Sequence, residues 1–390
     1  MMYEKEVKEK VTAILPQVVT WRRHFHEYPE LSGKEVKTSA YIQDVFKNLG
    51  IPYETGFFQN AVLGIIKGSH PGKTVALRAD MDALPVTELT GLPFASKNEG
   101  VMHACGHDGH MSILLGAAAV LNEMKDQIHG TVKIVFQPAE EEAAIGRHIA
   151  ASGKLDDVSE IYGLHVWPEL PTGQVGLKPG ALMAASDRFY VHIKGKSTHA
   201  AQPHNGTDAL VAAAHFIIDV QSLISREMNP MDNVVCTIGL MNAGTRYNVG
   251  VEDAYLEGTC RTYRPELRDK MEARLGEILK GLDVMFHTHS ELNYVRGHSA
   301  TINTPEKIDF LKKVGKAYLG EEHITEPEFP SMCAEDFSSY LEKFPGAFFW
   351  LGTGDGNTPA LHNASFAINE SILPLGITLE AAAALEALSR

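Results

Sequence analysis

The stretch His103-Ala104-Cys105-Gly106-His107-Asp108-Gly109-His110 lies directly before the apolar run Ile113 to Leu121. It gathers imidazoles, a thiol and a carboxylate, and transition metals prefer imidazole and thiolate as ligands. Because the apolar run predicts a helix, we expect the cluster on a tight turn at a helix N-terminus, where free N–H groups favour a thiolate. The alternative is a polar loop with scattered histidines. So many ligand types in one short stretch favour a metal site.

Short apolar strands alternate with helices on both sides of this cluster. Strands are predicted at 61–66, 74–78, 131–136, 160–166 and 348–352, and helices at 3–27, 38–49, 140–151 and 306–319. This alternation of nearly apolar strands with helices predicts an α/β fold with a mostly parallel sheet covered by helices. In such sheets, ligands bind beyond the carboxyl ends of the strands.

Candidate site residues gather at these strand ends. Asp80 and Asp82 follow the second predicted strand, Glu140 to Glu142 follow the third, and His165 ends the fourth. His362 follows a glycine-rich loop after the strand at 348–352. Taken singly, such a histidine is more often a packed core residue, and consecutive glutamates are often a solvated first helical turn. Their convergence at several strand ends favours a site.

Glu140 and Glu141 are adjacent at the start of a predicted helix, where neighbouring side chains point about 100° apart. One carboxylate can therefore bind a metal ion while the other faces a water molecule. Metal-assisted hydrolysis needs both roles, because the ion lowers the pKa of water and a base removes the proton.

The pattern changes after Pro179-Gly180. The predicted order of elements between 187 and 295 is β-α-β-β-α-β, which is the ferredoxin-like unit. We expect a catalytic domain at 1–180 and 297–390, with residues 181–296 inserted as a second domain. The insert contains the loop Gly195 to Pro203, in which His199 could donate to a substrate carbonyl. A solvent-exposed loop without a function is the alternative.

Composition narrows the class of protein. A chain of 390 residues exceeds the usual size of one hydrophobic core, so two domains are expected. The net charge of −14 argues against nucleic acid or an anionic membrane as a partner. The charged N-terminus and the lack of a long apolar run predict neither an export signal nor a membrane span. Four cysteines far apart in the sequence suggest reduced thiols in the cytoplasm.

Several of these motifs occur together in one known family. They are Arg78 to Pro85, His103 to Asp108, Gln137 to Glu141, Gly163 to His165, Gly195 to Pro203, and Ala334 to Phe337 leading to His362. Because it contains these motifs in this order, the chain resembles the amidohydrolase branch of the metallo-aminoacylase and glutamate-carboxypeptidase family. That branch includes hippurate hydrolases, N-acyl-amino-acid deacylases and auxin-conjugate hydrolases.

The resemblance implies a site for two divalent metal ions, Mn²⁺ or Zn²⁺, with Co²⁺ or Ni²⁺ as further candidates. The implied ligands are Cys105, His107, Glu141, His165 and His362. Glu140 is implied as the general base, and Asp82 matches an aspartate of the family and is assigned to catalysis with it. The inserted domain is implied to act as a lid and as the surface of a homodimer or larger homo-oligomer.

The resemblance also implies that His199 binds the substrate carbonyl, often in the site of the neighbouring subunit. Asn248 and Arg261 are further candidate substrate contacts. Two departures from the family pattern are Asp80, which stands where related branches have a metal-binding histidine, and the segment Asn248 to Asp253, where relatives usually have Asn-Val-Ile-Pro-Asp.

The sequence thus predicts a cytoplasmic metal-dependent hydrolase that cleaves the amide bond of an N-acyl amino acid or short peptide. Two alternatives remain open. One is a metallo-aminopeptidase or dipeptidase of the same family, and the other is a non-catalytic binding or scaffold protein on this fold.

Overall fold

The computed structural model describes residues 3–143 and 145–389. The chain divides into two compact units. The larger unit is Met1–Leu182, Ile302–Pro330 and Asp336–Arg390, and the smaller unit is Met183–Thr301 and Ser331–Glu335. The catalytic and lid roles expected for these parts of the chain stay predictions.

Within the described residues, the larger unit contains an eight-stranded sheet in the order β1-β2-β4-β3-β5-β14-β6-β13. Its strands are β1 (Tyr53–Glu54), β2 (Val62–Lys67), β3 (His70–Asp80), β4 (His129–Gln137), β5 (Val158–Pro171), β6 (Val175–Gly176), β13 (Ile324–Thr325) and β14 (Gly346–Gly354). Strands β4, β3, β5 and β14 run parallel, while β2 is antiparallel to β4. This confirms the predicted mostly parallel sheet. A separate pair is formed by β7 (Gly180–Met183) and β12 (Thr301–Asn303).

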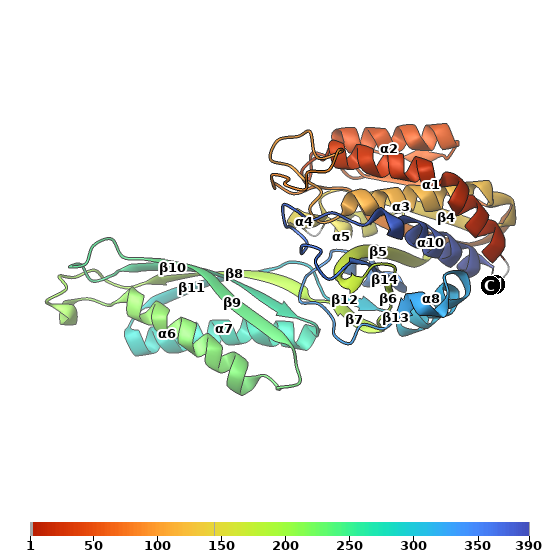
Figure 1. Ribbon diagram of the computed structural model, residues 1–390. Helices are drawn as coiled ribbons and strands as arrows, with labels where there is room; N and C mark the ends of the chain where they lie inside the picture. The colour runs from red at the N-terminus through yellow and green to blue at the C-terminus, as the bar shows by residue number, and fades with distance from the viewer. Residues whose placement is uncertain (1–2, 144, 390) are drawn as a thin grey trace. The chain divides into compact units, whose positions relative to one another are not determined.

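Helices cover both faces of this sheet. They are α1 (Glu4–Glu27), α2 (Val36–Leu49), α3 (His107–Glu123), α4 (Glu140–Ala143), α5 (Gly146–Ala150), α8 (Pro305–Tyr318), α9 (Ser338–Leu341) and α10 (Leu373–Leu388), with short helical turns at η1 (Lys125–Gln127), η4 (Glu321–His323) and η5 (Glu370–Ile372). Helix α3 packs between α1 and α10 and against β3 (Figure 1). Tyr162 of β5 faces Phe310 of α8, whereas the next residue, Gly163, lies against Phe337. Because successive side chains of a strand point to opposite faces, the two contacts lie on opposite sides of the sheet.

Gly106 connects Cys105 to His107, the first residue of α3. Its φ of +84° is in the left-handed region that favours glycine, and it directly precedes the helix. A Cβ atom at this position would come within 2.5 Å of Cγ2 of Val166 in β5. The turn and the close approach to β5 therefore both require glycine, and they bring Cys105 and His107 next to the strand that carries His165.

The smaller unit has the predicted ferredoxin-like topology. Its elements in chain order are β8 (Ala185–Lys194), η2 (Pro203–Asn205), α6 (Ala209–Ser222), η3 (Leu223–Glu227), β9 (Val234–Ala243), β10 (Asp253–Thr262), α7 (Pro265–Phe286) and β11 (His289–Arg296). The antiparallel sheet has the order β11-β8-β10-β9. Helices α6 and α7 lie side by side on one face of it (Figure 1).

Two predicted elements differ from the structure. The predicted helix 140–151 is instead α4 and α5, with residue 144 outside the described residues, and the backbone N–H of Gly146 donates to Oδ2 of Asp336 where α5 begins. The strand predicted to end at 166 continues to Pro171, because β14 pairs with it up to Trp167 and, after a register shift, again at Pro171. His165 therefore lies within β5 and does not end it. It still lies beyond the last pair between β5 and β3, which joins Gly163 to Arg78.

Two helical segments of the described chain have the length and composition of a membrane span, although none was predicted. They are Ala209–Glu227 and Glu370–Leu388. Core helices of soluble proteins meet the same criterion, and 78% of the apolar window of the second segment is buried, against 33% for the first. The first segment therefore keeps an exposed apolar face.

Candidate metal centre

Cys105, His107 and His165 converge at the N-terminus of α3. Their ligand atoms all lie within 4.8 Å of one another, and Sγ of Cys105 is 3.4 Å from Nε2 of His165. All three side chains are buried. Nδ1 of His165 lies 2.6 Å from the carbonyl oxygen of Val166, so donation from this nitrogen leaves Nε2 directed at the thiol.

Asp82 orients the ring of His107. Nδ1 of His107 is 2.9 Å from the carbonyl oxygen of Asp82 and 3.3 Å from its Oδ1. Donation from Nδ1 leaves Nε2 unprotonated, and this buried atom has no hydrogen-bond partner among the described residues. A carboxylate or a backbone carbonyl that fixes the tautomer of a ligating histidine is a common support of metal sites, and here the carbonyl of Asp82 accepts from Nδ1. The position of Asp82 therefore fits an orienting role.

Glu141 and His362 complete the set of predicted ligands. Oε1 of Glu141 is 3.2 Å from Nε2 of His362, and both lie within 4.8 Å of the Cys105 thiol. The backbone of each is held: the N–H of Glu141 donates to Oδ2 of Asp82, and the N–H of His362 donates to the carbonyl of Ala104. His362 has a φ of +66°, an uncommon conformation for a side chain other than glycine that often occurs at functional sites.

Glu140 lies beside the ligands in a protected position. It is 6% exposed. A carboxylate oxygen of Glu140 lies within 4.8 Å of a carboxylate oxygen of Glu141 and of a ring nitrogen of His107. Oε1 of Glu140 accepts a hydrogen bond from the backbone N–H of Asp336 at 3.3 Å. The preceding residue, Ala139, has a φ of +54°, so a strained backbone position precedes the pair of glutamates.

His110 and His103 differ from His107, although all three belong to the same stretch. Nδ1 of His110 is 2.6 Å from Oδ1 of Asp80, and Nε2 accepts from the N–H of Val166, so both nitrogens are occupied. His103 is buried, neither ring nitrogen has a hydrogen-bond partner among the described residues, and burial lowers its pKa to about 4. Of the three, His107 is the one whose ring nitrogen lies in a ligand group with the Cys105 thiol.

The charges of the cluster fit bound cations. Burial by itself lowers the pKa of His107, but Asp80 and Asp82 raise it to about 10. Burial, together with the negative charges of Glu141 and Glu140, raises the pKa of the Cys105 thiol well above its usual range. The site thus has an excess of buried negative charge that a divalent ion would offset, and coordination would deprotonate the thiol.

The donor set also fits two ions. The group Cys105, His107 and His165 and the group Cys105, Glu141 and His362 share the thiol. Together they supply nitrogen, oxygen and sulfur donors of the kinds that zinc and other transition metals accept. The five predicted ligands are thus brought together.

The predicted substrate-binding residues lie in the smaller unit, where two loops face each other. His199 and Val249 form a β-bridge, and the N–H of Ala200 donates to the carbonyl of Asn248. His199 is exposed, and its Nδ1 accepts a hydrogen bond from the N–H of Ala201. His199 and Asn248 are therefore neighbours within this unit.

Arg261 is not part of this pair of loops. It pairs with Ser186 near the opposite end of the ladder, whereas Asp253, near the loops, pairs with Lys194. Eight residues of strand separate Asp253 from Arg261, about 26 Å. The structure therefore does not bring Arg261 together with His199 and Asn248.

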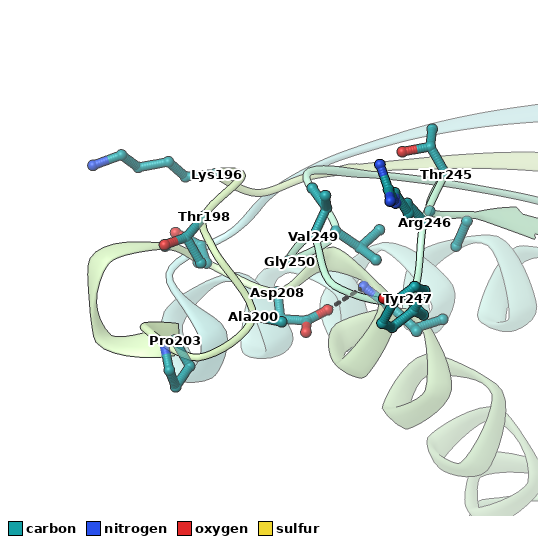
Figure 2. A pocket seen from close by; sticks show the side chains of 16 residues that line it. Lys196, Thr198, Ala200, Pro203, Asp208, Thr245, Arg246, Tyr247, Val249 and Gly250 are labelled. Atoms are coloured by element: carbon teal, nitrogen blue, oxygen red, sulfur yellow. Dashed lines mark hydrogen bonds between the residues drawn. The ribbon is translucent and has the colours of Figure 1, made fainter.

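A cavity of about 540 Å³ lies between the two loops of the smaller unit. Figure 2 shows Thr198 and Pro203 on one loop and Arg246, Tyr247 and Val249 on the other. Asp208 at its floor caps α6 by accepting the N–H groups of Leu210 and Val211. The cavity is open and its walls are mixed in polarity, so its geometry alone names no ligand.

Most of the chain matches a known protein family. Residues 76–386 match the sequence profile of peptidase family M20/M25/M40. This chain belongs to that family. The match confirms the resemblance inferred from the motifs and identifies the chain as a hydrolase that acts on amide bonds. A non-catalytic scaffold is thereby set aside.

Several members of the M20 family are similar over nearly the whole chain. An N-acetyl-L-cysteine deacetylase of Bacillus subtilis is 39% identical over 92% of this chain and 85% of its own length. An N-acetyldiaminopimelate deacetylase of Listeria innocua is 39% identical over 93% and 97%. The solved structure of the Bacillus subtilis YXEP protein, described as a dinuclear metal binding peptidase from the M20 family, is 34% identical, covers 97% and 99%, and has a TM-score of 0.86.

Sequence reasoning missed residues that support the cluster from outside. Ser32 donates to Oδ2 of Asp82 at 2.6 Å. Arg78 and Gln137 bind the carboxylate of Asp336, whose backbone contacts Glu140. Arg78, Gln137 and Asp336 belong to the motifs that carry the family resemblance, which was the available signal, whereas Ser32 lies outside those motifs.

Proposed function

We propose that this chain hydrolyses the amide bond of N-acyl amino acids and releases a carboxylic acid and a free amino acid. The observation that carries the proposal is the convergence of Cys105, His107, Glu141, His165 and His362 beside the buried carboxylate of Glu140. The similarity to two deacetylases that act on different N-acetyl amino acids supports this substrate class.

Glu140 is the proposed general base. Bound divalent ions would polarise the scissile carbonyl and lower the pKa of a water molecule. Glu140 accepts a proton from that water while the oxygen of the water forms a bond to the carbonyl carbon. The carboxyl group then delivers this proton to the amine nitrogen as the C–N bond breaks. A general base typically contributes 10²- to 10⁴-fold to the rate.

His199 and Asn248 are the proposed substrate-binding residues, because their loops adjoin within the smaller unit. An imidazole N–H of His199 donates to the oxygen that becomes negative as water adds, and one such donor typically contributes about 10²- to 10³-fold. Arg261 stays a predicted contact that this geometry does not support.

We further propose Mn²⁺ or Zn²⁺ as the native ions, with Co²⁺ or Ni²⁺ able to use the same donors, and a cytoplasmic location. The mixed nitrogen, oxygen and sulfur ligands support the first proposal. The second is supported by the cysteines, all of which are free thiols in the structure. Cys236 and Cys260 come within 3.6 Å across two strands and are still not bonded.

The smaller unit is also the proposed surface of a homodimer. Strand β9 is an edge strand of sequence VVCTIGLMNA and has no charged residue, although edge strands that stay unpaired usually carry protective charges. Leu240 of β9 and Leu210, Val211 and Ile218 of α6 are exposed apolar residues along this side, and Ile218 is 60% exposed. Pairing of β9 with its copy would satisfy the edge and cover this face.

A panel of substrates tests the reaction. We expect N-acetyl and N-benzoyl amino acids to be hydrolysed with a higher kcat/KM than the matching free dipeptides, measured as release of free amino acid with Mn²⁺, Zn²⁺ or Co²⁺. Efficient cleavage of free dipeptides without cleavage of the N-acyl amino acids would instead identify a dipeptidase or aminopeptidase, because those enzymes recognise the free amine.

A further inference from the structure

A buried carboxylate outside the metal cluster, that of Asp336, is held from three directions. Oδ1 accepts a hydrogen bond from Nη2 of Arg78 at 2.7 Å, and Oδ2 accepts one from the backbone N–H of Gly146 at 2.7 Å. The amide nitrogen of Gln137 lies 2.8 and 2.6 Å from the two oxygens. Asp336, Gln137 and Arg78 are all at most 1% exposed. This residue therefore has little freedom to move.

The main chain of Asp336 connects this network to Glu140. Its backbone N–H donates to Oε1 of Glu140, and its side chain holds Gly146, the first residue of α5. The carboxylate of Asp336 thus fixes both the donor that Glu140 uses and the chain that follows α4. A Cβ atom on Gly146 would lie 2.8 Å from the carbonyl oxygen of Asp336, so the two segments are packed tightly.

Arg78 extends the network to the other side of the cluster. Its Nη1 donates a hydrogen bond to Oδ2 of Asp80, and its Nε donates one to Oε1 of Gln137. The same oxygen of Gln137 also accepts a hydrogen bond from the hydroxyl of Tyr340. The planar guanidinium of arginine fixes the directions of its hydrogen bonds as well as their lengths, whereas the ammonium group of a lysine does not. The guanidinium therefore sets the separation between the strand that ends at Asp80 and the segment that contacts Glu140.

We propose that Asp336, held by Arg78 and Gln137, is a positioning residue that fixes the carboxylate of Glu140 for proton transfer. The proposal rests on the proposed function, in which Glu140 is the base. The backbone N–H of Asp336 donates to Glu140, and its carboxylate lies within 4.8 Å of the Glu140 carboxylate, so Asp336 acts on the reaction through Glu140. A displacement of about 1 Å at a reacting group can cost 10²-fold in rate, so a lost anchor should affect kcat.

Asp336→Asn tests the proposal with little change of shape. The new amide group must face the side chains of Arg78 and Gln137 and the N–H of Gly146, all of which are donors, so the anchor is lost while the backbone N–H remains. We expect kcat for an N-acetyl amino acid to fall by about 10²-fold. KM should stay within twofold, and the metal content should remain that of the wild type.

A double-mutant cycle separates positioning from general damage. In the Glu140→Gln background the carboxylate that Asp336 positions is gone, so we expect Asp336→Asn to change the residual kcat by less than twofold. An equal fall of kcat in both backgrounds overturns the proposal. If Asp336→Asn does not fold, Gln137→Met enters the same cycle, because it removes only the amide and keeps the ion pair with Arg78.

Glu160→Gln is the matched control. Glu160 is also a buried carboxylate, 5% exposed, and pairs with Lys307 and the hydroxyl of Tyr162 near the start of β5, five positions before His165. We expect it to lower the melting temperature and leave kcat within twofold. If Glu140→Gln alone keeps wild-type kcat, the base assignment fails and the positioning role falls with it. If Glu140→Gln behaves as expected and the cycle is additive, only the positioning role fails.

Discussion

Individual side chains near the metal centre obtain their roles from their partners. His107 and His110 are one helical turn apart on α3. Asp82 contacts only Nδ1 of His107, which leaves Nε2 free to bind a metal ion. In His110 both nitrogens are occupied, Nδ1 by Asp80 and Nε2 by the N–H of Val166. Two residues of the same type thus differ in role: His107 is a proposed metal ligand, and His110 is a structural link.

The three consecutive glutamates allow a direct comparison of roles. Glu140→Gln keeps the shape of the side chain but removes the base, so we expect kcat to fall by about 10²- to 10⁴-fold with the metal content unchanged. Glu141→Gln should instead lower the metal content, measured by elemental analysis of the purified protein. Glu142 is exposed and serves as the matched control, because Glu142→Gln should change neither quantity. A loss of metal with Glu140→Gln and a normal metal content with Glu141→Gln would require the two roles to be exchanged.

Several of the proposed ligands could be singled out because their chemistry is local in the sequence. Cys105 and His107 are two positions apart, and Glu140 and Glu141 are adjacent, so their residue types and spacing indicate a site. The contact between Arg78 and Asp336 joins residues 258 positions apart and is made by folding alone. The same limit explains why Ser32, which donates to Asp82, was not identified.

At the scale of elements, helix α10 contains a carboxylate without a compensating partner. Glu380 is 1% exposed, and its Oε2 has no hydrogen-bond partner among the described residues. Burial raises the pKa of Glu380 well above its usual range. The folded protein therefore binds a proton there more tightly than the unfolded chain does, and the ionised form destabilises the fold as the pH rises.

Glu380→Met should stabilise the protein, because it removes the buried ionisable group and keeps the length of the side chain. We expect a gain of about 1–3 kcal/mol in the free energy of unfolding at pH 8, measured by urea denaturation. The gain should shrink as the pH falls to 5, where Glu380 of the wild type is closer to protonation.

Glu386→Met on the same helix is the control for this prediction. Glu386 accepts the hydroxyl of Tyr318 at 2.8 Å, so its removal should destabilise the protein by about 0.5–1.5 kcal/mol. A stabilisation by Glu380→Met that is equal at pH 5 and pH 8 would contradict the assigned cause.

Element types were easier to predict than element limits. The strands of the parallel sheet are recognised by their apolar runs, and β8 by its alternation of buried and partly exposed residues. The end of β5 depends on its pairing with β14, and the division between α4 and α5 coincides with a hydrogen bond to Asp336. Both come from distant parts of the chain. Helix α10 lies outside the predicted elements, because it is apolar on nearly every side and lacks amphipathic periodicity.

At the scale of the whole molecule, the residues proposed to take part in hydrolysis are divided between the two units of the chain. The proposed ligands and Glu140 belong to the larger unit, whereas His199 and Asn248 belong to the smaller one. The edge strand β9 and the exposed face of α6 belong to the smaller unit as well. A homodimer formed there could supply His199 from either chain, and mixing experiments distinguish these arrangements.

His199→Ala should lower kcat by about 10²- to 10³-fold with normal folding and metal content. When this variant is mixed with Glu140→Gln and the chains reassociate at random, sharing of His199 between subunits restores about one quarter of wild-type activity, because half of the dimers contain one intact site. Activity equal to the sum of the two variants, in a sample shown by mass spectrometry to contain heterodimers, would mean that His199 acts within its own chain or has no catalytic role.

Amide hydrolysis by this chain should depend on metal ions held by a set of five residues, Cys105, His107, Glu141, His165 and His362. The most direct measurement is the rate of hydrolysis of an N-acetyl amino acid before chelation, after prolonged chelation and dialysis, and after return of Mn²⁺ or Zn²⁺, with the metal content determined at each stage. We expect that turnover disappears with the metal and returns with it. Undiminished turnover in a sample shown by elemental analysis to be free of metal would contradict it.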